Sequence, residues 1–306
     1  MLKNRRPSRF AVVNGFVLIA LASGLVLTAT AGASPRFGFI RSVGEFFGMA
    51  STTTPTGTIA LTDETATAEG HAPDLMAILA SSQQGGKLVG TGNAGAAQQG
   101  YSVSLSADGN TALIGGRADN GGHGAAWVWT RSGGVWTQQG GKLVGTGNTG
   151  AAEQGYSVSI SADGNTALVG GVNDNSAQGA AWVWTRSGGV WMQQGGKLVG
   201  TGSIGARTVQ GHSVSLSADG NTAIVGGYLD NSAQGAAWVW TRSGSVWTQQ
   251  GGKLVGTGNT GAAGQGHSVS LSADGNTAIV GGEFDNSGQG AAWVWTRSGS
   301  VWTQQG

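Results

Sequence analysis

Residues 100–116 read GYSVSLSADGNTALIGG, and residues 124–131 read GAAWVWTR. In the first stretch Val103 and Leu105 alternate with serines, which is the two-residue period of a β-strand with two different faces. Asp108-Gly109 then predicts a tight hairpin, because glycine accepts a positive φ. The pattern predicts strands over residues 101–106, 111–114 and 125–131, with a polar loop over residues 117–124.

Nearly the same sequence recurs three more times along the chain. Glutamine pairs begin at Gln83, Gln138, Gln193, Gln249 and Gln304, which gives spacings of 55, 55, 56 and 55 residues. A fixed period of this length indicates an array of units, none of which can bury its own apolar face alone. The repeats run over residues 83–137, 138–192, 193–248 and 249–303.

A fourth strand follows the third after a short turn. If Ser132-Gly133 is the two-residue loop, Arg131 pairs with Gly134 and Trp129 faces Trp136. The same counting predicts three more facing pairs: Trp184 with Trp191, Trp240 with Trp247, and Trp295 with Trp302. The twelve tryptophans of the chain all fall in four such sets of three. We expect them to pack between neighbouring units, with a sugar-stacking platform as the functional alternative.

Four antiparallel strands per unit predict an all-β fold, a β-propeller of four-stranded blades. A parallel β-helix is the main rival, but Asp-Gly and Ser-Gly hairpins require antiparallel neighbours. Three arrangements of the repeats remain open. Residues 83–92 and the end of the chain complete one blade together, the four repeats belong to a longer ring, or two chains associate. An open array would leave end faces that favour self-association.

The N-terminus carries the features of an export signal. Lys3, Arg5, Arg6 and Arg9 precede an apolar core over residues 16–27, and small residues at 31–33 offer a cleavage site. We therefore expect a signal peptide over residues 1–33 and a product that is extracellular, on the cell surface or periplasmic. An uncleaved segment would instead anchor the chain in a membrane. Residues 34–82 are predicted to be a linker, in which Pro73 could open a short helix through Leu79.

Composition excludes several classes of function. The net charge is +1 and no basic cluster lies inside the repeats, so we expect no nucleic-acid partner. Cysteine is absent and there are only four histidines, which leaves no thiol nucleophile and no zinc-ligand spacing. We predict no catalytic residues, no cofactor and no enzyme activity. Near-identical units suit repeated weak contacts with a protein or glycan surface instead.

The copies differ most just after the second strand, and the substitutions change charge, size and polarity while the flanks stay constant. Positions that vary within a constant frame are candidates for ligand specificity, or for drift in a tolerant loop. The candidate residues are Arg117 and Ala118, Val172 and Asn173, Tyr228 and Leu229, and Glu283 and Phe284. A second slot holds Tyr101, Tyr156, His212 and His267, which we expect to be aromatic residues on the surface or lining a channel.

The stretches quoted at the outset resemble FG-GAP repeats over about residues 83–306. That family builds the β-propeller of integrin α subunits, and bacterial exported proteins carry simpler versions, so the resemblance implies a β-propeller. The chain departs from the pattern where the family's Phe-Gly becomes Gln99-Gly100 and its Gly-Ala-Pro becomes Gly115-Gly116-Arg117.

Calcium-binding integrin blades carry several carboxylates between their first two strands, whereas each copy here keeps one, at Asp108, Asp163, Asp219 and Asp274. Because calcium takes six to eight oxygens, these are weak calcium candidates that we expect to bond turn amides. A second set, Asp119, Asp174, Asp230 and Asp285, could add oxygens only if the fold joined the two loops.

The sequence therefore predicts an exported, non-catalytic β-propeller repeat protein that mediates protein or surface interaction. Two alternatives remain: a carbohydrate-binding, lectin-like propeller, and the propeller portion of a larger secreted enzyme.

Overall fold

The computed structural model describes residues 10–13, 16–19, 25–29, 57–61 and 83–306. The chain divides into two units between Gln83 and Gln84. The first unit has four short strands, paired antiparallel as β1 with β2 and β3 with β4. Their bounds are β1 Phe10–Val13, β2 Phe16–Ile19, β3 Leu25–Ala29 and β4 Gly57–Leu61. The helix expected from Pro73 lies outside the described residues.

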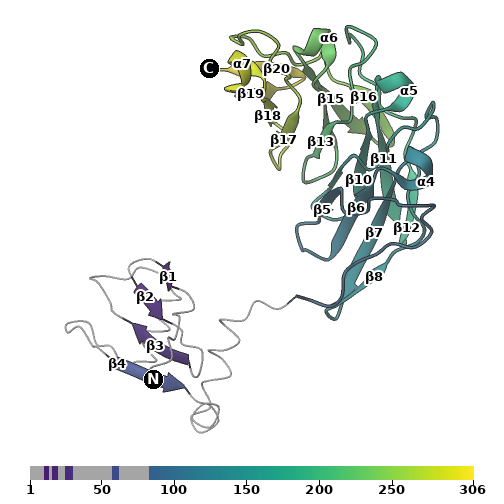
Figure 1. The fold of residues 1–306 in the computed structure, drawn as a ribbon. Helices are drawn as coiled ribbons and strands as arrows, with labels where there is room; N and C mark the ends of the chain where they lie inside the picture. Colours follow the sequence, from purple (N-terminus) through teal and green to yellow (C-terminus); the bar gives the residue numbers. More distant parts are fainter. Residues whose placement is uncertain (1–9, 14–15, 20–24, 30–56, 62–82) are drawn as a thin grey trace. The chain divides into compact units, whose positions relative to one another are not determined.

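The second unit consists of four antiparallel sheets of four strands each, one per repeat (Figure 1). This confirms the prediction of an all-β fold with β-propeller blades. Blade 1 has β5 Ser102–Leu105, β6 Thr111–Gly116, β7 Ala125–Ser132 and β8 Val135–Gln138. Blade 2 has β9 Ser157–Ile160, β10 Thr166–Gly171, β11 Ala180–Ser187 and β12 Val190–Gln193.

Blades 3 and 4 repeat the plan. Blade 3 has β13 Ser213–Leu216, β14 Thr222–Gly227, β15 Ala236–Ser243 and β16 Val246–Gln249. Blade 4 has β17 Ser268–Leu271, β18 Thr277–Gly282, β19 Ala291–Ser298 and β20 Val301–Gln305. The polar loop after each second strand holds a single turn: α4 Asp119–Gly122, α5 Asp174–Ala177, α6 Asp230–Ala233 and α7 Asp285–Gly288.

The predicted register of the last hairpin is wrong. Ser132 pairs with Val135 and Arg131 with Trp136, so Trp129 lies opposite Gln138 and none of the four predicted tryptophan pairs forms. The turn needs a positive φ at its first central residue, and Gly133 supplies φ 55° there, whereas the predicted register placed Ser132 at that position. An arginine therefore covers the third tryptophan, with the Arg131 guanidinium 5.5 Å from the Trp136 ring centre.

The core lies between blades. Trp182 and Trp184 of blade 2 are buried against Leu113 and Val128 of blade 1, and equivalent clusters join blades 2 with 3 and 3 with 4. The expectation that tryptophans pack between neighbouring units is confirmed. The first two tryptophans of blades 2 and 3 are buried, so they expose no ring face on which a sugar could stack.

Close backbone approach explains the first glycine of the pair that ends the second strand in blades 1 to 3. A Cβ on Gly115 would lie 2.2 Å from the carbonyl oxygen of Gly155 in the next blade. The same carbonyl accepts a hydrogen bond from Ser102 Oγ at 2.8 Å. Any side chain at Gly115 would push the two blades apart.

The four blades form an open array. The first strands contact one another in the order β5, β9, β13 and β17, so they form its inner edge. Blades 1 and 4 lie at opposite ends of the array (Figure 1). Each exposes apolar residues at its end face. The four-unit ring closed by the two chain ends, one of three expected solutions, is therefore not formed.

Candidate functional site

Four rings form a continuous row along the inner edge of the array. Each stands just before the first strand of its blade, and we call Tyr101, Tyr156, His212 and His267 the aromatic row. Neighbouring ring centres lie 5.0 Å, 5.1 Å and 4.6 Å apart, with the rings tilted by 44° to 54°. The row exists because the repeat places one ring at the same point of every blade and the blades stack through their first strands.

The residues that differ most between copies converge on this row. At the blade 1 end, the guanidinium of Arg117 lies 4.4 Å from the Tyr101 ring centre and 5.6 Å from that of Tyr156. It also forms an ion pair with Glu153 at 3.2 Å. A cation held over two rings is stabilised by both of them.

At the blade 4 end, the row carries rings and a carboxylate. The Tyr228 ring centre lies 4.6 Å from that of His212 and 5.3 Å from that of His267. Phe284 is 6.2 Å from the His267 ring, and Glu283 Oε1 lies 3.1 Å from His267 Nε2. Half of the Glu283 side chain is exposed, so this end presents an acidic group to solvent.

The other predicted site residues contribute packing or hydrogen bonds around the row. Val172 is buried against Val209 and contributes packing beneath Tyr156 and Tyr228, as Leu229 does. Asn173 Nδ2 donates to Glu153 Oε1 at 2.6 Å, which holds the carboxylate that pairs with Arg117. Ala118 contributes a backbone N–H to the Ala97 carbonyl.

Burial changes the protonation of two rings in the row. Burial, followed by the charge of His267, lowers the pKa of His212. Burial and a hydrogen bond with Tyr101 raise the pKa of Tyr156. The middle of the row is therefore uncharged at neutral pH.

The single carboxylates of the hairpins are held by their own turns. Asp108 accepts hydrogen bonds from Ser106 Oγ at 2.5 Å, Asn110 N at 2.9 Å and Asn110 Nδ2 at 3.0 Å. The serine contact is the largest cause that lowers the pKa of Asp108, to about 2. Asp163, Asp219 and Asp274 make the same contacts. Calcium at these turns stays a prediction, and a bound ion would have to displace these donors.

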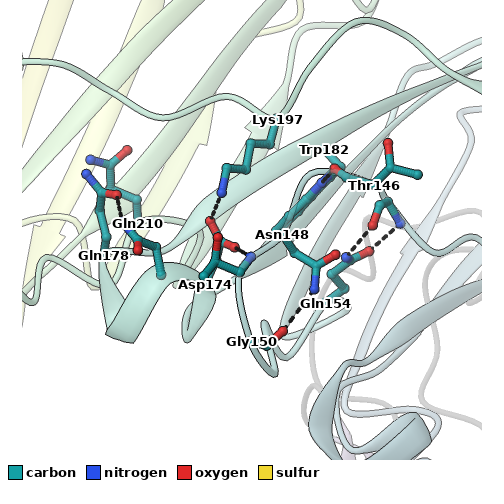
Figure 2. A network of polar contacts seen from close by, with 12 residues as sticks. Thr146, Asn148, Gly150, Gln154, Asp174, Gln178, Trp182, Lys197 and Gln210 are labelled. Atoms are coloured by element: carbon teal, nitrogen blue, oxygen red, sulfur yellow. Dashed lines mark hydrogen bonds and ion pairs between the residues drawn. The ribbon is translucent and has the colours of Figure 1, made fainter.

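The second set of carboxylates performs a different task. Asp174 is fully buried, accepts the backbone N–H of Thr149 at 2.7 Å and forms an ion pair with Lys197 (Figure 2). Asp119 and Asp230 do the same with Lys142 and Lys253. The structure does not bring this set to the hairpin carboxylates, and no cluster of three or more metal-ligating side chains occurs among the described residues.

Glutamine at the family's phenylalanine position forms a clamp. Gln154 is buried, and its amide accepts from Gly145 N at 2.6 Å and donates to Gly145 O at 2.9 Å (Figure 2). Gly145 lies on the link between blades 1 and 2, packed against Trp182. Copies at Gln99, Gln210 and Gln265 make the same pair of bonds.

Comparison with known proteins gives distant structural likeness only. No family model matches the chain, and no curated protein is significantly similar to it. The periplasmic gluconolactonase PpgL of Pseudomonas aeruginosa is 18% identical with a TM-score of 0.46, over 67% of this chain and 56% of that one. Hydrazine synthase of Kuenenia stuttgartiensis is 16% identical with a TM-score of 0.43, over 70% and 49%. TolB of Acinetobacter baumannii is 14% identical with a TM-score of 0.37, over 66% and 42%.

The chain spans about half the length of these solved structures. Such low identity transfers no activity or ligand. Within the described residues, no helix has the length and hydropathy needed to cross a lipid bilayer.

Proposed function

We propose that the chain is an exported, non-catalytic β-propeller repeat protein of the FG-GAP type that binds a protein surface through the aromatic row. The observation that carries the proposal is convergence: four of the residues that vary between copies contact a row of rings that spans all four blades. They are Arg117, Tyr228, Glu283 and Phe284. A site made of one ring per blade offers repeated weak contacts rather than the mixed chemical roles that catalysis requires.

The packing of the rings favours a protein ligand over a glycan. Sugars stack on open aromatic faces, whereas the rings of the row lie 4.6 Å to 5.1 Å from one another and Arg117 lies over the Tyr101 ring. Tyr101 is 44% exposed, so this end of the row is open to a ligand such as an extended peptide. Three steps of about 5 Å correspond to roughly four or five residues of an extended strand. The exposed carboxylate of Glu283 favours a basic residue in the ligand at the blade 4 end.

A peptide-display library tests this proposal. Twelve-residue peptides selected on the wild-type chain should carry a basic residue, and their affinity should fall at least tenfold with Glu283→Gln or Tyr156→Ala. Val190→Ala on the outer strand β12 is the control that should leave affinity unchanged. Selected peptides that bind all four proteins equally would show that the row is not the site. Preferential binding to a glycan array would favour the lectin-like alternative, and turnover by the purified chain would favour the enzyme alternative.

Export is tested separately. A reporter that is active only outside the cytoplasm, fused after residue 82, should become active and be released with a new N-terminus at Ser34. A reporter retained in the membrane fraction would indicate an uncleaved anchor, and an inactive reporter would contradict export.

A further inference from the structure

The last blade of the array exposes a surface that is buried in the other three. Ile279 on β18 is 44% exposed, whereas Ile224 at the same point of blade 3 is fully buried. Ala291 and Ala292 are exposed too, while their counterparts Ala236 and Ala237 are buried. We call Ile279, Ala291, Ala292 and Val294 the tail face. An open hollow lies on it, lined by Val269, Ile279 and Ala292 among others.

The first blade exposes the complementary surface. Val103 and Leu105 on β5 are 68% and 60% exposed, whereas Leu216, the counterpart of Leu105 in blade 3, is 8% exposed because blade 2 covers it. Together with the link residues Lys87 and Leu88, they form what we call the head face.

The sequence identifies what fits the tail face. Where blade 3 meets blade 4, TAIVGG (222–227) and AAWVWTRS (236–243) face SVSL (268–271), and the link GGKLVGTG (251–258) crosses between them. The tail face carries the same TAIVGG (277–282) and AAWVWTRS (291–298). The head carries the same SVSL (102–105) and GGKLVGTG (85–92). A head placed on a tail would therefore closely repeat an interface that the molecule already forms, with Ile114 in the place of Val280.

Polar groups match as well as apolar ones. At the internal interface Ser213 Oγ donates to Gly266 O at 2.8 Å, and Leu271 N donates to Ser215 Oγ at 3.1 Å. The equivalent tail hydroxyls, on Ser268 and Ser270, are exposed at the end of the array. The equivalent head groups are the Gly100 carbonyl and the Leu105 N–H.

Charge provides a second, independent match. In blades 1 to 3 a carboxylate pairs with the lysine of the link that follows: Asp119 with Lys142, Asp174 with Lys197, and Asp230 with Lys253. No described residue forms an ion pair with Asp285 of blade 4, and Lys87, which precedes blade 1, is exposed. Within residues 83–306 neither Asp285 nor Lys87 has an ion-pair partner, and the Asp285 carboxylate accepts only the Thr260 N–H at 2.7 Å. The tail therefore offers a carboxylate, and the head an ammonium, that lacks an opposite charge.

We propose that the tail face of one copy binds the head face of a second copy of this chain, with Asp285 paired to Lys87 across the junction. Two copies joined at both junctions would give eight blades, within the range known for propellers. The junction would also place His267 of one copy beside Tyr101 of the other and extend the aromatic row.

Light scattering on the full chain tests the junction. Wild-type protein at tens of micromolar should have at least twice the 30.5 kDa mass of one chain. Ile279→Arg should block the tail face and Val103→Arg should block the head face, so each variant alone should be monomeric. An equimolar mixture retains one intact head and one intact tail, and should form a complex of two copies and no larger species. Both positions are exposed, so circular dichroism should show an unchanged fold.

Val301→Arg is the matched control. Val301 is 64% exposed, and its counterparts Val135, Val190 and Val246 are 65%, 62% and 63% exposed, so no blade interface covers this position. This variant should associate like wild type. A longer series of masses, from an open head-to-tail filament, would also support the junction. Monomeric wild type, or association that survives both arginine variants, would overturn the proposal.

Discussion

Single buried carboxylates secure the links between blades. The Asp174 carboxylate is fully buried, where an isolated charge is costly unless it is paired. Lys197 and the Thr149 N–H satisfy it, and both lie on the links that flank blade 2, so one residue holds two crossing segments.

Asp174→Asn should lower the free energy of unfolding by about 2–3 kcal/mol, because it removes charged hydrogen bonds and leaves Lys197 without its partner. Urea unfolding at low protein concentration measures this. Asp285→Asn is the matched control, because Asp285 is half-buried and has no lysine partner within residues 83–306, and it should cost under about 1 kcal/mol. Equal losses in the two variants would contradict the structural role assigned to the lysine pair.

A pH dependence follows from His212. Its pKa is lowered in the folded state, so the folded chain binds fewer protons at this site than the unfolded chain, whose histidine titrates near 6.5. The stability contribution is complete above about pH 6.5 and is lost as the pH falls through the lower folded pKa. Urea midpoints should therefore fall between pH 7.5 and pH 5.5, and should fall less in His212→Tyr, which installs the ring of blades 1 and 2. An identical pH response in both proteins would rule out His212 as the cause.

At the scale of elements, the link between blades is held as firmly as a strand without belonging to a sheet. Leu143 pairs with Ala126 of blade 1, and two residues later the Gln154 amide bonds both backbone groups of Gly145. The glutamine side chain replaces the peptide group that a neighbouring strand would offer. This explains why a polar residue stands at this point of every blade.

Gln154→Ala should destabilise the chain by about 2–4 kcal/mol, because it leaves a buried N–H and a buried C=O without partners. Gln193→Ala is the control. Gln193 also accepts a backbone N–H, from Thr146, and donates to Gly195 O, but at an exposed site where water can replace it. We expect its loss to cost under about 1 kcal/mol in the same thermal or urea measurement. A Gln154 effect no larger than the Gln193 effect would mean that packing, not the amide, holds the link.

Across the whole molecule, the sequence predicted the blades well and the contacts between blades poorly. Two-residue alternation and Asp-Gly turns are local signals, so strands such as β5 and β6 were located within two residues. The register of the Trp129 hairpin was not, because a choice between Ser132 and Gly133 as first turn residue shifts every pair. The clamp at Gln154 and the pair of Asp174 with Lys197 depend on how units stack, which no local pattern contains.

The candidate site was recovered in part for the same reason. Arg117, Tyr228 and Glu283 stood out because the repeat supplies its own constant background. The sequence also singles out the slot that holds Tyr101 and His267, but not the contacts of this slot with the variable residues. Those contacts arise only when the first strands of neighbouring blades stack along the inner edge. One signal for these contacts was available in the sequence: the slot changes from tyrosine in blades 1 and 2 to histidine in blades 3 and 4, while the variable positions change as well.

An open array should also be unevenly stable. Each unit of a repeat array is stabilised by its neighbours, so an end unit has one interface where an inner unit has two. Residues of β10 and β14 are buried throughout, whereas alternate residues of β18 are exposed. Local opening of blade 4 should therefore require less free energy than opening of blades 2 and 3.

Amide hydrogen exchange measured by mass spectrometry can compare the blades, because the variable residues give each second strand and its following loop a distinct mass. In the monomeric double variant Val103→Arg, Ile279→Arg, the peptide containing β18 should exchange at least tenfold faster than those containing β10 and β14. In wild type at high concentration that difference should shrink, since the head of a second copy would cover β18. Uniform exchange across all four blades in the monomer would instead mean that the array unfolds as one cooperative unit, and that interface number does not set local stability here.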